Sequence, residues 1–114
     1  MRGTATRKIG DLSETLATGF LERNDFVIIE RNYYAGKLGE IDIIATKDDI
    51  LHFIEVKSSF NDFDPVYNIT PSKLNKVINS VHYYLKHKGL DMIFCIDALL
   101  IRKDEVELIE NITL

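Results

Sequence analysis

The sequence lacks the features of a membrane-spanning or secreted protein. No stretch reaches the roughly 18 consecutive apolar residues of a transmembrane helix, and no apolar run follows the basic N-terminus, as a signal peptide would require. The single cysteine, Cys95, cannot form an internal disulfide. Its apolar neighbours in Met92–Ile101 favour packing as a small hydrophobic side chain over a reactive thiol. We therefore expect a cytoplasmic protein without disulfides.

The chain also lacks repeats, low-complexity tracts and any stretch typical of an interdomain linker. Its 114 residues fall within the usual size of one domain, about 100–150 residues. Apolar residues make up 46% of the chain and charged residues 28%, close to the average for globular proteins. The sequence therefore predicts a single domain over residues 1–114.

Acidic residues are missing from one long stretch, although the formal net charge is −4. No Asp or Glu occurs between Pro65 and Leu90, and this stretch contains Lys73, Lys76, Lys86 and Lys88. The net charge argues against a nonspecific nucleic-acid binder, because phosphate affinity comes mainly from Lys and Arg. A local basic surface and a plain solvated helix face both remain open.

Apolar periodicity and turn residues predict an α/β fold. The spacing of apolar residues predicts helices over Ile9–Arg23 and Pro71–Lys88, the second with Thr70 as N-cap and Gly89 as its stop. Residues typical of β-structure predict five strands, at Phe26–Asn32, Gly39–Thr46, Ile50–Lys57, Met92–Ile101 and Val106–Ile109. The order α-β-β-β-α-β-β predicts helices packed on a mixed sheet.

Charged residues interrupt the second and third predicted strands. If residues 48–49 form a two-residue hairpin loop, Asp42 faces Glu55 and Glu40 faces Lys57. Opposite side chains in an antiparallel pair have Cβ atoms about 4.5–5.5 Å apart, and like charges there repel. The register therefore calls for a positive charge between the acids, whereas a three-residue loop would make their contact diagonal.

Two carboxylates at this spacing can hold a hard divalent cation such as Mg²⁺ or Mn²⁺. Lys57, on the same face as Glu55, could then position a water or stabilise developing charge. The alternative without a metal is a surface ion-pair network centred on Lys57. Glu14 lies at the border of the apolar stripe of the first helix, so it could lean over the sheet as a further ligand or remain a rim charge.

These residues resemble the YraN-like family, small bacterial proteins related to Holliday-junction resolvases within the PD-(D/E)xK nuclease superfamily. The resemblance runs through ETLATGFL, ERNYYAGKLGEIDIIA, LHFIEVK, SKLNKVINSVHYYL and CIDALLI. Its most specific part is GEIDIIA followed closely by FIEVK. The chain departs from the family pattern at Ser13, Ile41 and Ser59, and these departures bear on DNA affinity more than on metal binding.

The resemblance implies a restriction-endonuclease-like fold with an αβββαβ core. It also implies that Asp42, Glu55 and Lys57 form the nuclease signature and that Glu14 is the acid carried by the first helix. Lys73 resembles a recurrent basic residue early in the second helix.

Two hypotheses about function follow. The first is a Mg²⁺- or Mn²⁺-dependent nuclease that hydrolyses phosphodiester bonds in DNA, branched DNA included. Its phosphate contacts would come from Lys73, Lys76, Arg7 and Lys8, and cutting both strands of a junction would favour a homodimer. The second is a noncatalytic module on the same fold that binds nucleic acid or protein. Asp97 matches a family position in the fourth strand, where we expect a structural hydrogen-bonding role rather than metal ligation.

Overall fold

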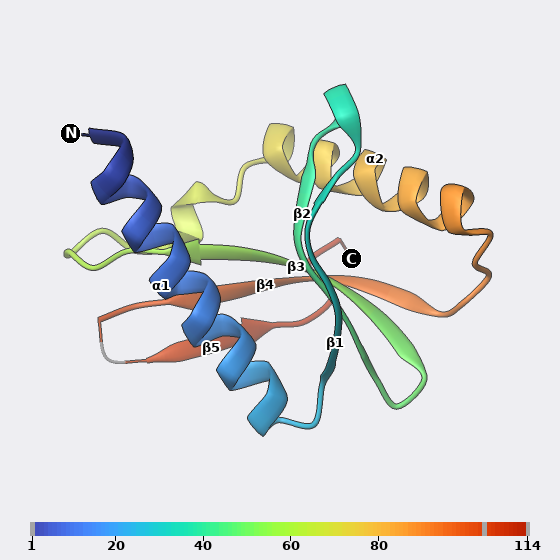
Figure 1. Ribbon diagram of the computed structural model, residues 1–114, viewed down its shortest axis with the longest axis horizontal. Coiled ribbons are helices and arrows are strands. Elements are labelled where there is room, and N and C mark those ends of the chain that lie inside the picture. The colour runs from blue at the N-terminus through green and yellow to red at the C-terminus, as the bar shows by residue number, and fades with distance from the viewer. Residues whose placement is uncertain (1, 104, 114) are drawn as a thin grey trace.

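The computed structural model describes residues 2–103 and 105–113, with the side chains of residues 2–11 outside this description. Its two helices are α1 (Arg2–Arg23) and α2 (Pro71–Lys88). The five strands are β1 (Val27–Tyr34), β2 (Glu40–Lys47), β3 (Ile50–Ser58), β4 (Phe94–Ile101) and β5 (Val106–Ile109). The element order confirms the predicted α/β class (Figure 1).

All five strands belong to one mixed sheet with the strand order β1-β2-β3-β4-β5. Its first three strands and its last pair are antiparallel, whereas β3 and β4 are parallel. A parallel pair needs a long crossover connection, and α2 supplies it here. Strand β3 therefore lies in the centre, paired on both sides.

One helix covers each face of the sheet (Figure 1). Side chains alternate across a strand, so neighbouring residues of β2 and β3 enter different cores. The core under α1 contains Ala17, Leu21, Ile43, Ala45, Ile54 and Leu99. The core under α2 contains Val77, Val81, Ile44, Leu51, Phe53 and Ile96. These two largely apolar cores stabilise the three-layer arrangement.

The predicted ends of the second helix are confirmed. Thr70 Oγ1 accepts a hydrogen bond from the Lys73 N–H at 3.3 Å, and Gly89 ends the helix in the left-handed region with φ 63°. The first helix, in contrast, begins at Arg2 rather than at Ile9. The apolar stripe starts only at Ile9, so the earlier turns gave no amphipathic signal.

The predicted two-residue hairpin loop between β2 and β3 is also confirmed. Lys47 pairs with Ile50, and both loop residues have positive φ, 53° at Asp48 and 64° at Asp49. Positive φ at both central residues is typical of a type I′ turn, whose backbone twist matches the right-handed twist of the flanking strands. Two short 3₁₀ helices, Gly36–Leu38 and Pro65–Asn68, lie in loops for which no regular structure was predicted. Among the described residues, neither helix has the length and apolar character needed to cross a membrane.

Candidate functional site

Strands β2 and β3 stop pairing where their charged residues begin. The ladder runs from the hairpin turn to Ile43, which pairs with Ile54. Beyond that point the Val56 N–H donates a hydrogen bond to Asp42 Oδ2 at 2.8 Å. In an uninterrupted ladder a backbone carbonyl of β2 would accept this bond. The Asp42 carboxylate therefore lies between the diverging strands and takes the place of the backbone.

The predicted cross-strand pairs are thus only partly correct. The register holds as far as Ile43, but the β2–β3 pairs among the described residues end there and include neither Asp42 with Glu55 nor Glu40 with Lys57. Beyond Ile43 the strands separate, and the Val56 N–H that the next rung of the ladder would use donates to the Asp42 carboxylate instead.

The acidic side chains still meet, as the sequence predicted. Burial, followed by the nearby Glu55 charge, raises the pKa of Asp42 from 3.8 to about 7, although the Val56 N–H and Lys57 act in the opposite direction. Lys57 Nζ lies 3.0 Å from Glu55 Oε1. The other oxygen, Glu55 Oε2, is buried and accepts no hydrogen bond from the described residues. The cluster therefore contains two close carboxylates, one ammonium and one buried oxygen without a donor.

Glu14 and Glu40 border this cluster. Burial raises the pKa of Glu40, and the charges of Asp42 and Glu14 raise it further. The Glu14 carboxylate leans towards β1, where it lies 3.1 Å from Arg31 Nε and accepts hydrogen bonds from Asn32 Nδ2 at 3.1 and 3.2 Å. Of the two alternatives for Glu14, the structure shows the carboxylate leaning over the sheet, where it contacts the Arg31 guanidinium and the Asn32 amide of β1. Its role as a metal ligand stays a prediction.

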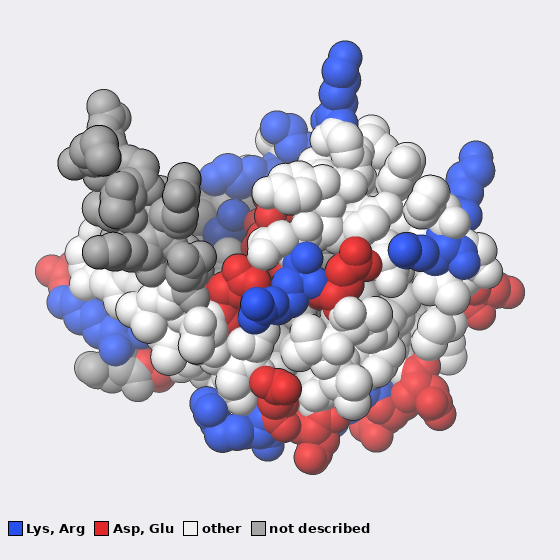
Figure 2. Space-filling model, viewed as in Figure 1, with Lys and Arg blue, Asp and Glu red and all other residues white. Residues whose placement is uncertain are grey.

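The predicted phosphate-binding residues lie on α2 and α1. A small cavity of about 10 Å³ separates Glu55 and Lys57 from Lys73 on the first turn of α2. Lys73 and Lys76 are both exposed. The side chains of Arg7 and Lys8 lie outside the described residues. Basic side chains project along the upper edge of the molecule, where α2 lies, while acidic ones gather at the lower edge (Figure 2).

A close approach between α2 and the start of β2 positions the acidic cluster. Gly39 has φ 143°, and a Cβ built there would lie 3.0 Å from Ser80 Oγ on α2. Only glycine accepts this conformation and spacing without strain. Gly39, the glycine of the GEID motif, therefore allows the chain to enter β2 close to α2, which positions Glu40 and Asp42.

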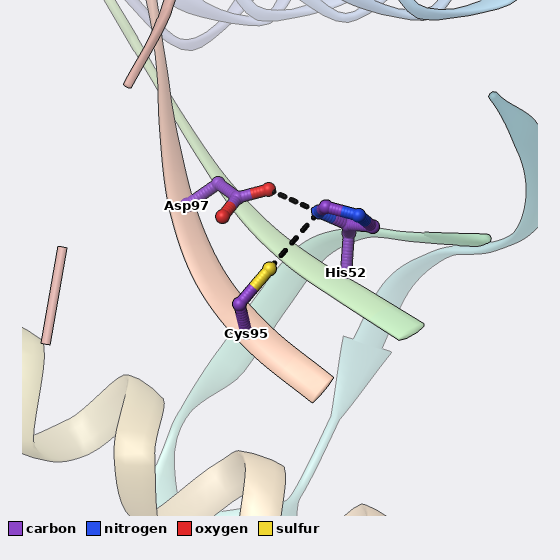
Figure 3. Close-up of side chains that lie close together, drawn as sticks. All are labelled: His52, Cys95 and Asp97. Carbon is purple, nitrogen blue, oxygen red and sulfur yellow. Dashed lines mark hydrogen bonds and ion pairs between the residues drawn. The ribbon is translucent and has the colours of Figure 1, made fainter. Parts of the chain in front are cut away.

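A second cluster, which sequence analysis did not find, lies on the other face of β3 (Figure 3). His52 Nδ1 is 2.6 Å from Asp97 Oδ2 and 3.1 Å from Cys95 Sγ. The ligand-type atoms of these three residues lie within 4.8 Å of one another, which makes them a group that could hold a metal ion. His52 and Asp97 are buried, whereas Cys95 is half-buried. Cys95 therefore contacts an imidazole rather than only the apolar neighbours expected from sequence.

Asp97 has the hydrogen-bonding role predicted for it. Its Oδ1 accepts the Asn111 N–H at 2.9 Å, and its Oδ2 contacts His52. Burial, together with the charge and hydrogen bonding of Asp97, raises the pKa of the Cys95 thiol to about 12. The cluster depends on β3–β4 pairing, in which His52 lies opposite Cys95. Because that pairing spans α2, no local sequence signal could have revealed it.

Comparison with known proteins identifies the family. The sequence model described as "Uncharacterised protein family UPF0102" matches residues 13–104. A UPF0102 protein of Sulfurovum sp. (strain NBC37-1) is 70% identical over 105 residues, covering 92% of this chain and 93% of the relative. UPF0102 proteins of Wolinella succinogenes and Helicobacter hepaticus are 53% and 50% identical, with 96% of this chain covered in each case and 99% and 97% of the relatives. The chain belongs to the UPF0102 family.

Proposed function

We propose that this UPF0102 protein is a divalent-metal-dependent nuclease that hydrolyses phosphodiester bonds in DNA, branched DNA included. The observation that carries the proposal is the meeting of two carboxylates and a lysine where β2 and β3 separate. A folded protein rarely keeps close, part-buried like charges without a compensating partner. A catalytic or metal-binding role therefore explains this cluster better than a contribution to folding stability does.

The residues present fit Mg²⁺ or Mn²⁺. Asp42 and Glu55 offer carboxylate oxygens, the ligands that such hard cations prefer. Glu55 Oε2 is buried without a hydrogen-bond donor among the described residues, so it is available to a cation. When bound, the ion would polarise a phosphoryl oxygen and make a coordinated water more acidic. Its charge would also offset the repulsion between Asp42 and Glu55.

Lysine and arginine residues of the proposed site would bind the substrate. The Lys57 ammonium can hydrogen-bond a water or a phosphate oxygen beside Glu55, because an ammonium has three donors and, among the described residues, Lys57 forms an ion pair with Glu55 alone. Lys73 lines the same cavity as Glu55 and Lys57, and Lys76 is exposed on the next turn of α2. Both would contact phosphates without reading base sequence. Arg7 and Lys8 would extend this contact. Paired cuts at a junction would need two such sites, which a homodimer would provide.

The test is a cleavage assay on linear, nicked and four-way DNA in EDTA, Mg²⁺ or Mn²⁺. We expect cleavage only with a divalent ion. Asp42→Asn and Lys57→Met should each lower the rate at least about 100-fold, the usual cost of removing one charge-stabilising group. Lys47→Met is the matched control, because Lys47 lies at the hairpin-loop end of β2, 5.1 Å from the centre of the Phe26 ring.

Two results would contradict the nuclease proposal. Cleavage that persists unchanged in Asp42→Asn would come from another protein in the preparation. Absence of both cleavage and any metal-induced change in melting temperature, together with DNA or protein binding that Asp42→Asn leaves intact, would favour the noncatalytic binding module instead.

A further inference from the structure

The cluster of His52, Cys95 and Asp97 is independent of the acidic site. His52 and Glu55 are three positions apart on β3, which places them about 10 Å apart along the strand. They also point to opposite faces, since His52 contacts Phe26 beside α1 while Glu55 lines the cavity beside α2. A ligand at one cluster would therefore not share residues with the other.

The three side chains supply a mixed nitrogen, sulfur and oxygen ligand set. Imidazole, thiolate and carboxylate are the three side-chain groups that bind Zn²⁺, whereas Mg²⁺ takes oxygen ligands. Around a tetrahedral Zn²⁺ such ligand atoms stand about 3.3–3.6 Å apart, given bond lengths of about 2.0–2.3 Å. The observed separations from His52 Nδ1 are 2.6 Å to Asp97 Oδ2 and 3.1 Å to Cys95 Sγ. All three ligand atoms lie within 4.8 Å of one another, so side-chain shifts on the order of 1 Å would bring them to the separations of a tetrahedral site.

The arrangement does not fit a nucleophilic thiol. A cysteine activated by histidine needs the thiol on one ring nitrogen and an orienting acceptor on the other. Here Cys95 and Asp97 both approach Nδ1 of His52 (Figure 3). One ring nitrogen cannot serve both partners as a proton relay. Three groups of ligand type gathered within 4.8 Å of one another are, in contrast, what a bound cation requires.

We propose that His52 Nδ1, Cys95 Sγ and Asp97 Oδ2 bind a Zn²⁺ ion that links β3 to β4. Binding releases the Cys95 thiol proton to solvent, with no change of oxidation state. Asp97 would then be a ligand as well as the hydrogen-bonding residue expected from sequence. Its Oδ1 keeps the Asn111 N–H, as carboxylate ligands commonly do, and the ion takes the place of the contact between Oδ2 and His52. A water entering on the half-buried side of Cys95 completes four ligands.

The first experiment is Co²⁺ titration of the full chain, since Co²⁺ reports thiolate coordination by a near-ultraviolet charge-transfer band. We expect one ion per chain with this band. Cys95→Ser should abolish the band and lower Co²⁺ and Zn²⁺ affinity at least 10-fold, a typical effect of changing the ligand environment. Asp42→Asn should leave the band unchanged, so failure of the nuclease site and of this site are distinguished. A wild-type chain without the band overturns the proposal.

A second experiment needs no variant at the cluster and so does not depend on its folding. Cys95 is the only cysteine, so alkylation by iodoacetamide reports on one thiol. Equimolar Zn²⁺ should slow this reaction at least 10-fold, and a 100-fold excess over the dissociation constant should raise the melting temperature by on the order of 10 °C. Unchanged alkylation and unchanged melting in Zn²⁺ would refute the site.

Discussion

Replacing Asp42 by asparagine should make the metal-free protein more stable at neutral and alkaline pH. Asparagine keeps an oxygen that can accept the Val56 N–H, which lies 2.8 Å from Asp42 Oδ2. It removes the negative charge that burial and the Glu55 carboxylate disfavour. A substitution at the proposed active site would thus stabilise the fold while abolishing the proposed activity.

The sign follows from the raised pKa of Asp42. Well below about pH 4 the Asp42 carboxyl is protonated in both the folded and the unfolded chain, so it does not lower the free energy of unfolding. Between its unfolded value of 3.8 and its folded value of about 7, the folded state retains a proton that the unfolded chain releases, and stability falls as pH rises. Above about pH 7 the penalty is complete. At about 1.4 kcal/mol per pKa unit, the shift in the pKa of Asp42 corresponds to about 4 kcal/mol of folding stability.

The raised pKa of Asp42 already includes the opposing effects of Lys57 and of the Val56 N–H, so the measured gain for Asp42→Asn at pH 8 should be close to this penalty, about 4 kcal/mol. This corresponds to a rise in melting temperature on the order of 10 °C. The assay is urea and thermal unfolding by circular dichroism from pH 4 to pH 8 in EDTA. Asp25→Asn, at an exposed position, is the matched control and should show no such pH dependence. Equal stability of Asp42→Asn and wild type at pH 8 would refute the reasoning.

Three further substitutions test the fold, each by the free energy of unfolding from urea titration. Gly39→Ala should destabilise by about 1–3 kcal/mol, because φ is 143° and the new Cβ would meet Ser80 Oγ at 3.0 Å; an unchanged midpoint would contradict this. Changing Asp48 and Asp49 to Asn-Gly should stabilise by about 1 kcal/mol, since both have positive φ, and a loss would argue against the type I′ turn. Thr70→Ala should cost about 1 kcal/mol, and Thr70→Ser should restore most of it.

The acidic site could be predicted from sequence because a local turn determines its register. The two-residue loop sets Lys47 opposite Ile50, and alternation then brings Asp42 and Glu55 together. Cap residues such as Thr70 and Gly89 likewise act within a few residues of their own position. Features such as these, which depend on residues close together in the chain, can be predicted from the local amino-acid sequence.

Tertiary structure alone decided how the strands end and which distant residues meet. The Asp42 carboxylate replaces a backbone rung at Val56 only because the sheet separates there. The meeting of His52 with Cys95 and Asp97 depends on a parallel pairing across the α2 crossover. No hairpin turn joins two parallel strands, so no local turn sets their register. The packing of the crossover helix positions the strands instead. The sequence by itself therefore determined one cluster, and the assembled sheet determined the other.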